Sequence, residues 1–125
     1  MHDKAREKSP EELAVLERLR RLCFRFAEVA EAVDGFGHTS FRVGKKPFTM
    51  MGSQQLLLAI KTDPITQEHL INSGRFRRTP YIGQHGWVDV VDFNAVDWEE
   101  IEGLIADAYR LVAPKRLLRQ LPKGF

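Results

Sequence analysis

Hydrophobic residues recur at helical spacing near the start of the chain. Ser9, Pro10 and Glu12 precede them and combine an N-cap, a proline at the first helical position and an S-x-x-E capping box. The apolar positions that follow are Leu13, Leu16, Leu19, Leu22, Cys23 and Phe26. We predict an amphipathic helix to about residue 27. Residues 29–33 extend the same stripe if the helix continues, and Asp34 and the glycines after it break the pattern.

Strand-like alternation replaces this spacing after Gly37. Phe41 and Val43 alternate with polar residues, and Phe48 and Met50 do the same after the short polar segment at residues 44–46. Period-2 patterning on both sides of a glycine-containing turn predicts a β-hairpin. Since two of the three tip residues are lysines, the hairpin has a basic tip.

The middle of the chain adds a third strand and a second helix. Residues 55–61 form a short apolar run between turn-forming residues, which favours a buried strand. Asp63 and Pro64 then repeat the pattern of a cap followed by proline, and Gly74 stands where a C-terminal glycine cap belongs. The second helix is therefore short.

A second hairpin is predicted from two further strands, at residues 79–82 and 87–91. The residues between them, 83–86, begin and end with glycine, which suits a turn. Three arginines, Arg75, Arg77 and Arg78, precede this hairpin and make its approach basic.

The last helix begins at an Asp97 cap, with Glu100 completing a capping box. Its apolar positions are Trp98, Ile101, Leu104, Ile105, Ala108, Tyr109 and Val112. Pro114 ends or kinks it, and the tail after it carries leucines at the spacing of a short amphipathic helix.

These elements predict an α+β fold, in which an antiparallel sheet of two hairpins carries helices packed on one face. With 125 residues and 43% hydrophobic content, the chain forms one domain over residues 1–125, and residues 1–8 are expected to be disordered. The single cysteine, Cys23, excludes an internal disulfide and suits a reducing compartment. Since the sequence shows neither a secretory signal nor an apolar run long enough to span a bilayer, we expect a cytoplasmic protein without membrane contact.

The charges are segregated along the chain. Residues 35–86 carry 7 basic and 2 acidic side chains, whereas residues 87–108 carry 7 acidic side chains and no basic ones. The last 17 residues are basic again, with five cations and no acid. Such asymmetry can focus a positive field on the hairpins, although a charged run is often only a solvated surface.

The common motifs of nucleotide, dinucleotide, metalloprotease and serine hydrolase chemistry do not occur in this sequence. His38 and His85 lie beside glycines, and either one can in principle pair with Asp89 or Asp92 as acid and base. A histidine in a loop is more often simply exposed, and no ligand spacing indicates a metal. Cys23 lies on an apolar helix stripe, where a core residue is expected. We therefore predict no catalytic residues, no metal and no cofactor.

Four stretches of the chain carry a family resemblance. They are GHTSFRVGKKPFTMM, LLLAIKTDP, RFRRTPYIGQHGWVDV and IADAYRLVAPKRL. Their order and spacing resemble the MmcQ/YjbR family, whose members share an F-R-V-G-G-K hairpin, a W-V strand after a histidine-containing turn and a closing S-Y-x-L-V-A segment. The likeness runs from about residue 11 to residue 118. This chain departs from the family pattern where Ala27 and Glu28 replace a Pro-Gly pair.

The resemblance implies a CyaY-like (frataxin-like) fold and a DNA-binding role in which two hairpins act as a double wing. Its implied phosphate-binding residues are Arg42, Lys45, Lys46, Arg75, Arg77, Arg78 and His85. Because nothing in the sequence resembles a recognition helix, we expect duplex binding with little sequence specificity. The alternative is a module that binds a protein or a small ligand through a pocket at the hairpin edges, formed by His38, Tyr81 and Trp87.

Overall fold

The computed structural model describes residues 7–122. Its strands are β1 (Val29–Val33), β2 (Thr39–Val43), β3 (Lys46–Met51), β4 (Leu58–Lys61), β5 (Phe76–Arg78) and β6 (Trp87–Val90). Its helices are α1 (Pro10–Cys23), α2 (Pro64–Asn72), α3 (Trp98–Val112) and α4 (Lys115–Leu118), with short 3-10 turns at Gly83–His85 and Phe93–Ala95. The α+β class predicted from the sequence is confirmed.

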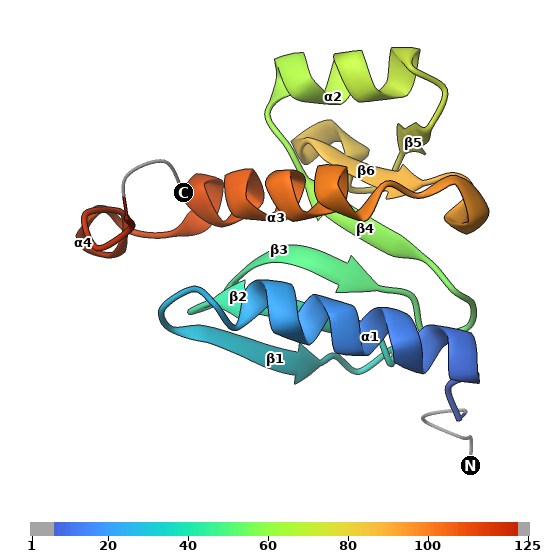
Figure 1. The fold of residues 1–125 in the computed structure, drawn as a ribbon, viewed down its shortest axis with the longest axis horizontal. Helices are drawn as coiled ribbons and strands as arrows, with labels where there is room; N and C mark the ends of the chain where they lie inside the picture. Colours follow the sequence, from blue (N-terminus) through green and yellow to red (C-terminus); the bar gives the residue numbers. More distant parts are fainter. Residues whose placement is uncertain (1–6, 123–125) are drawn as a thin grey trace.

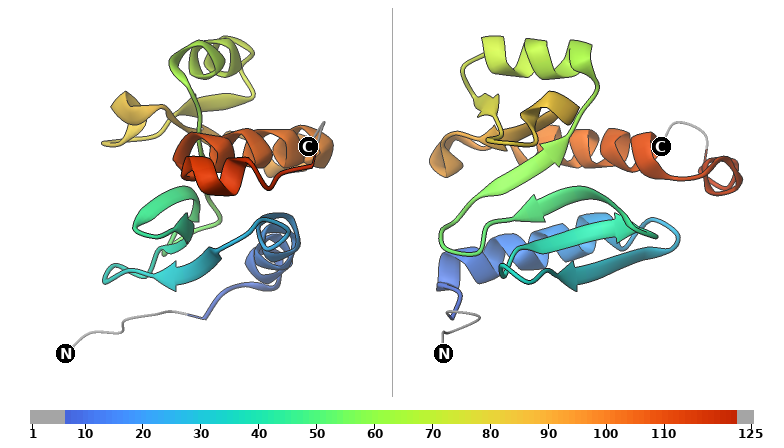
Figure 2. Two further views of the ribbon diagram at one scale, coloured as in Figure 1. Left: turned by 90° about the vertical axis from the view of Figure 1, so that its left-hand side faces the viewer. Right: turned by 180° about the vertical axis from the view of Figure 1, so that it is seen from behind.

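One antiparallel sheet of six strands organises the molecule, in the order β1-β2-β3-β4-β6-β5. Helices α1 and α3 lie next to each other on one side of the strands, and β1 to β4 are uncovered on the other side (Figures 1 and 2). Helix α2 contacts β5 and β6 at the far end of the sheet. We call the side of the sheet opposite α1 and α3 the open face.

The core fills the space between the sheet and these two helices. Tyr109 of α3 is fully buried at its centre, stacked on Phe26 with ring centroids 4.5 Å apart and in edge contact with Phe48. Its hydroxyl donates a 2.9 Å hydrogen bond to the carbonyl of Ala27, which ties the turn after α1 to α3. Cys23 is fully buried in the same cluster, as its place on the apolar stripe predicts.

The predicted helix starts are present. Ser9 and Glu12 form the reciprocal capping box, and Asp63 caps α2 through the backbone N–H of Thr66. Asp97 caps α3, but the capping box predicted with Glu100 is wrong in part, because the Glu100 carboxylate binds Arg75 instead.

The first helix is shorter than predicted. It ends at Cys23 rather than near residue 27, and residues 29–33 form β1 instead of extending the helix. Glu28, at φ +64°, sits in the left-handed region between them and reverses the chain. Pairing with β2 along five residues stabilises β1 as a strand, although its alanine and glutamate residues have low strand propensity.

The second hairpin begins earlier than predicted. Its first strand is Phe76–Arg78, and residues 79–82, predicted as a strand, belong to the turn. Pro80 cannot donate a ladder hydrogen bond, and Tyr81 adopts φ +68°, so neither residue continues a strand. The prediction of disorder for residues 1–8 falls mostly outside the described residues; Glu7 and Lys8 adopt neither helix nor strand.

Candidate nucleic-acid interface

Both hairpin turns leave the sheet at the same end. The Gly44-Lys45 tip joins β2 to β3, and β4, antiparallel to β3, ends at Lys61 near that tip. Lys61 stands opposite Trp87, the first residue of β6, and the turn at residues 79–86 connects β5 to β6 at this end. The Lys61 ammonium donates a 2.9 Å hydrogen bond to the carbonyl of His85 and so fixes the second turn beside β4. We call this end of the sheet, with its two turns, the tip end.

The ion pairs among the described residues leave out the cations at the tip end. No carboxylate within residues 7–122 forms an ion pair with Arg42, Lys45, Lys46 or Lys61. Three arginines on the helix side are paired: Arg20 with Glu31, Arg25 with Glu102 and Arg110 with Asp107. Arg18 and Arg21 of α1, like the tip-end cations, form no ion pair with a carboxylate of residues 7–122. Positive charge therefore remains uncompensated at the tip end.

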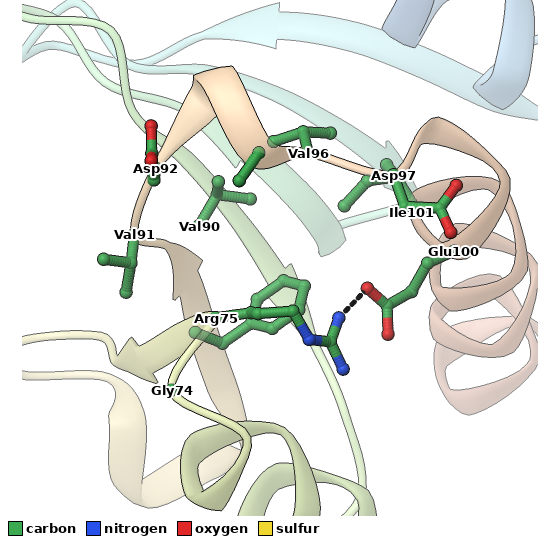
Figure 3. A pocket seen from close by; sticks show the side chains of 11 residues that line it. Gly74, Arg75, Val90, Val91, Asp92, Val96, Asp97, Glu100 and Ile101 are labelled. Atoms are coloured by element: carbon green, nitrogen blue, oxygen red, sulfur yellow. Dashed lines mark hydrogen bonds and ion pairs between the residues drawn. The ribbon is translucent and has the colours of Figure 1, made fainter.

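The arginines predicted for the second wing do not lie together. Arg75 turns away from the tip end and binds Glu100 at the start of α3, beside a cavity of about 320 Å³ (Figure 3). The Arg77 Nε lies 3.3 Å from the carboxylate of Asp89, a residue with no exposed surface. Arg78 lies opposite Val88 with the stem of its side chain against Gly83, and His85 is exposed in the turn.

A second basic region faces the first hairpin. Lys45 and Lys46 line a groove of about 430 Å³ together with the end of α3 and Arg116 of α4. Arg116 donates two hydrogen bonds, of 2.6 and 2.8 Å, to the carboxylate of Glu28. Hydrogen bonding to Arg116 lowers the pKa of Glu28, so this acid stays ionised and offsets one of the three cations. The groove remains net positive.

The alternative pocket predicted from the sequence is present in part. A cavity of about 520 Å³ lies on the open face, and His38 and Tyr81 both line it. Trp87 does not; its ring is buried, with the Lys61 ammonium 5.9 Å from its centre. Sequence reasoning missed Phe36, a lone aromatic between two glycines, which lines the cavity and is 79% exposed.

Among the described residues, neither His38 nor His85 pairs with Asp89 or Asp92, the partners considered for an acid-base role. His38 Nδ1 lies 3.1 Å from Asp34, and the side chain of His85 approaches Gln84. Asp89 instead accepts hydrogen bonds from Thr79 and Arg77. Within residues 7–122 no three His, Cys, Asp or Glu side chains come together in a way that can hold a metal. In the same part of the chain, none of the helices has the length and apolar character needed to cross a bilayer.

The fold and this end of the sheet define an α+β protein with basic hairpin turns. A family model described as YjbR matches residues 25–111, and the chain belongs to the YjbR family. The crystal structure of Deinococcus radiodurans protein DR2400, which carries the domain DUF419, has the same fold: its TM-score is 0.71 at 21% sequence identity, covering 88% of this chain and 91% of that one. No curated protein matches the sequence.

Proposed function

We propose that this protein is a non-enzymatic DNA-binding protein that holds duplex phosphates at the tip end. The observation that supports this proposal is the set of cations there, Arg42, Lys45, Lys46 and Lys61, none of which is ion-paired with a carboxylate of residues 7–122. Phosphate binding requires lysine or arginine presented on a shared surface, and each contact releases condensed counterions from the duplex.

The width of the tip end suits several phosphates. Four strand intervals separate β2 from β5, which at about 4.8 Å each span roughly 19 Å. Measured along the axis of a duplex, this length corresponds to about five phosphates of one strand, at 3.4 Å of rise each. The Lys61 hydrogen bond to the second turn keeps the middle of this surface in place.

The same surface predicts little sequence preference. In residues 7–122 the two long helices, α1 and α3, pack on the face of the sheet opposite the open face. Helix α2, with nine residues, lies at the far end of the sheet, on β5 and β6. Helix α3 reaches Lys45 and Lys46 with its last turn alone, while the rest of it packs on β3 and β4 and is not presented to a major groove. We infer that contacts go mainly to the backbone rather than to base edges.

The test is fluorescence anisotropy of a labelled random-sequence duplex at about 50 and 200 mM salt. We expect binding that weakens steeply with salt, as several phosphate contacts require. Lys45→Glu/Lys46→Glu should weaken binding at both salt concentrations and reduce the salt slope by about two, one for each lost phosphate contact.

Arg18→Glu/Arg21→Glu provides the matched control, because it makes the same charge change on the exposed side of α1. We expect a smaller effect from it, through the general field alone. Equal loss in the two double variants would mean that binding follows net charge and not the tip end. Absence of duplex binding at the lower salt concentration would refute the proposal.

A further inference from the structure

Two large aromatic side chains stand in solvent at the edge of one cavity. Phe36 is 79% exposed and Tyr81 is 95% exposed, and both line the open-face cavity of about 520 Å³. Single exposed apolar residues are ordinary, but two that border the same cavity indicate a binding surface. Phe36 comes from the β1-β2 loop and Tyr81 from the β5-β6 turn, so the pair spans the cavity from different parts of the sheet.

The exposure of Phe36 is built into its loop. The Asp34 carboxylate accepts hydrogen bonds from the backbone N–H groups of Phe36, at 2.8 Å, and His38, at 3.0 Å. Gly37, at φ +89°, donates its N–H to the Asp34 carbonyl and closes the turn. Partial burial alone would raise the pKa of Asp34, but these hydrogen bonds hold it below its usual value, so the loop keeps its ionised anchor at neutral pH.

Tyr81 is held outward by a strained turn. Its φ is +68°, a region that residues with a Cβ seldom adopt, and the N–H of Ile82 donates a 2.8 Å hydrogen bond to the Pro80 carbonyl across it. A side chain that is 95% exposed gains little packing within the chain to offset this strain. Strain of this kind is concentrated at binding sites, where the gain comes from a ligand.

The surface between the two aromatics combines an apolar floor with two carboxylates, Asp34 and Asp89, and has two arginines nearby. Arg77 is paired with Asp89, which leaves Arg42 as the arginine without an ion pair to a carboxylate of residues 7–122. Met50 and Ala59 lie in one lateral row across the open face, in register with Asp89 and Arg77. Arg42 donates to Ser40, which stands opposite Met50 in the same row. Cations along a surface with exposed aromatic rings are the arrangement on which unpaired bases stack while the backbone follows the positive charge.

We propose that the open face binds single-stranded nucleic acid, with bases stacked on Phe36 and Tyr81 and phosphates near Arg42. The inference rests on the proposed nucleic-acid binding and names an unpaired strand as a ligand of the adjoining surface. Stacking on a ring face does not depend on which base is present, so the preference is for unpaired over paired bases and not for a sequence.

The experiment compares three fluorescein-labelled ligands at the same low salt concentration: a 12-nucleotide oligothymidine, an abasic 12-mer with the same phosphates, and a 12-base-pair duplex. We expect the oligothymidine to bind at least about fivefold more tightly than the abasic strand, the lower bound for one stacked base. Phe36→Ala/Tyr81→Ala should remove this difference and leave duplex affinity within about twofold. Ile65→Ala, an exposed apolar residue of α2, is the matched control and should change neither.

The two proposals fail in different ways. Equal affinity for the oligothymidine and the abasic strand, or a preference that survives in the double variant, overturns the stacking site. The duplex proposal is then judged by the duplex affinity alone. Absence of binding to all three ligands overturns both. Thermal unfolding of each variant shows that the fold is kept, as expected for side chains this exposed.

Discussion

At the scale of single residues, Glu28 departs from the family pattern in a backbone conformation that favours glycine. Its φ of +64° lies in the left-handed region, which glycine adopts without strain, and the resembling family usually has glycine after proline at this point. Here the Glu28 carboxylate binds Arg116 of α4. The side chain thus joins the chain reversal after α1 to the tail, at the cost of a strained conformation.

Glu28→Gly is expected to raise the midpoint of thermal unfolding by about 3 °C, because relief of the left-handed strain outweighs an exposed ion pair. Calorimetry of the variant measures this. Arg116→Gln removes the ion pair and leaves the backbone strain, so it should lower the midpoint slightly or leave it unchanged. A midpoint for Glu28→Gly below that of the wild type would show that the tail contact is worth more than the strain.

At the scale of elements, α2 combines a side-chain cap with a small buried face. It has nine residues, of which Gln67 and Leu70 are buried, and Asp63 accepts hydrogen bonds of 2.8 Å from both the N–H and the hydroxyl of Thr66. These hydrogen bonds, the backbone one first, lower the pKa of Asp63. A carboxylate with a depressed folded-state pKa stabilises the fold above its unfolded pKa, and this contribution is lost as pH falls through the folded value.

We expect Asp63→Ala to cost about 1 kcal/mol at pH 7, as for other N-caps. Asp63→Asn keeps an acceptor but cannot titrate. It should stay near the wild type at pH 7 and lose less stability than the wild type between about pH 5 and pH 2. Urea unfolding across this pH range measures both effects. Identical acid sensitivity of the wild type and Asp63→Asn would mean that other carboxylates dominate the acid limb.

The sequence predicts elements best where local signals are strong. Caps at Ser9 and Asp63 and the alternation around the first hairpin are local, and the structure has those elements where they were expected. Strand β1 was missed because its pairing with β2 is non-local, and its sequence, Val-Ala-Glu-Ala-Val, matches a helix equally well. The shift of β5 to Phe76–Arg78 has a different cause: three residues carry too little alternation to locate a short edge strand.

The candidate site shows a similar division. Lysines at the hairpin tip follow directly from the sequence, because a turn exposes its residues whatever the fold around it. Arg75 and Glu100 are 25 residues apart in the sequence, so neither residue indicates that the two form an ion pair. Phe36 and Tyr81 meet at one cavity only because the β1-β2 loop and the β5-β6 turn both border the open face.

At the scale of the whole molecule, α3 packs across the middle of the sheet. It contacts β3 and β4 as well as α1, and Ile105 in its middle is fully buried in a core cluster that extends from Val15 to Leu117. One continuous core predicts one cooperative unfolding transition rather than separate melting of the two hairpins.

Ile105→Ala should lower the free energy of unfolding by about 2–5 kcal/mol, the usual cost of a large truncation in a packed core. Urea transitions followed by tryptophan fluorescence and by far-UV circular dichroism should shift together. Ile65→Ala, at a position 83% exposed, should change the free energy of unfolding by less than about 0.5 kcal/mol. Separation of the two optical transitions in Ile105→Ala would show that parts of the chain unfold independently.

The left-handed turn at Tyr81 has a consequence for any attempt to engineer this protein. A procedure that optimises thermal stability would select this position early, because glycine removes the strain and no packing is lost. If the exposed ring stacks on bases, the stabilised protein would melt later and bind unpaired strands more weakly. Stability and recognition are then opposed at a single residue, and a screen that scores stability alone would discard half of the proposed stacking site.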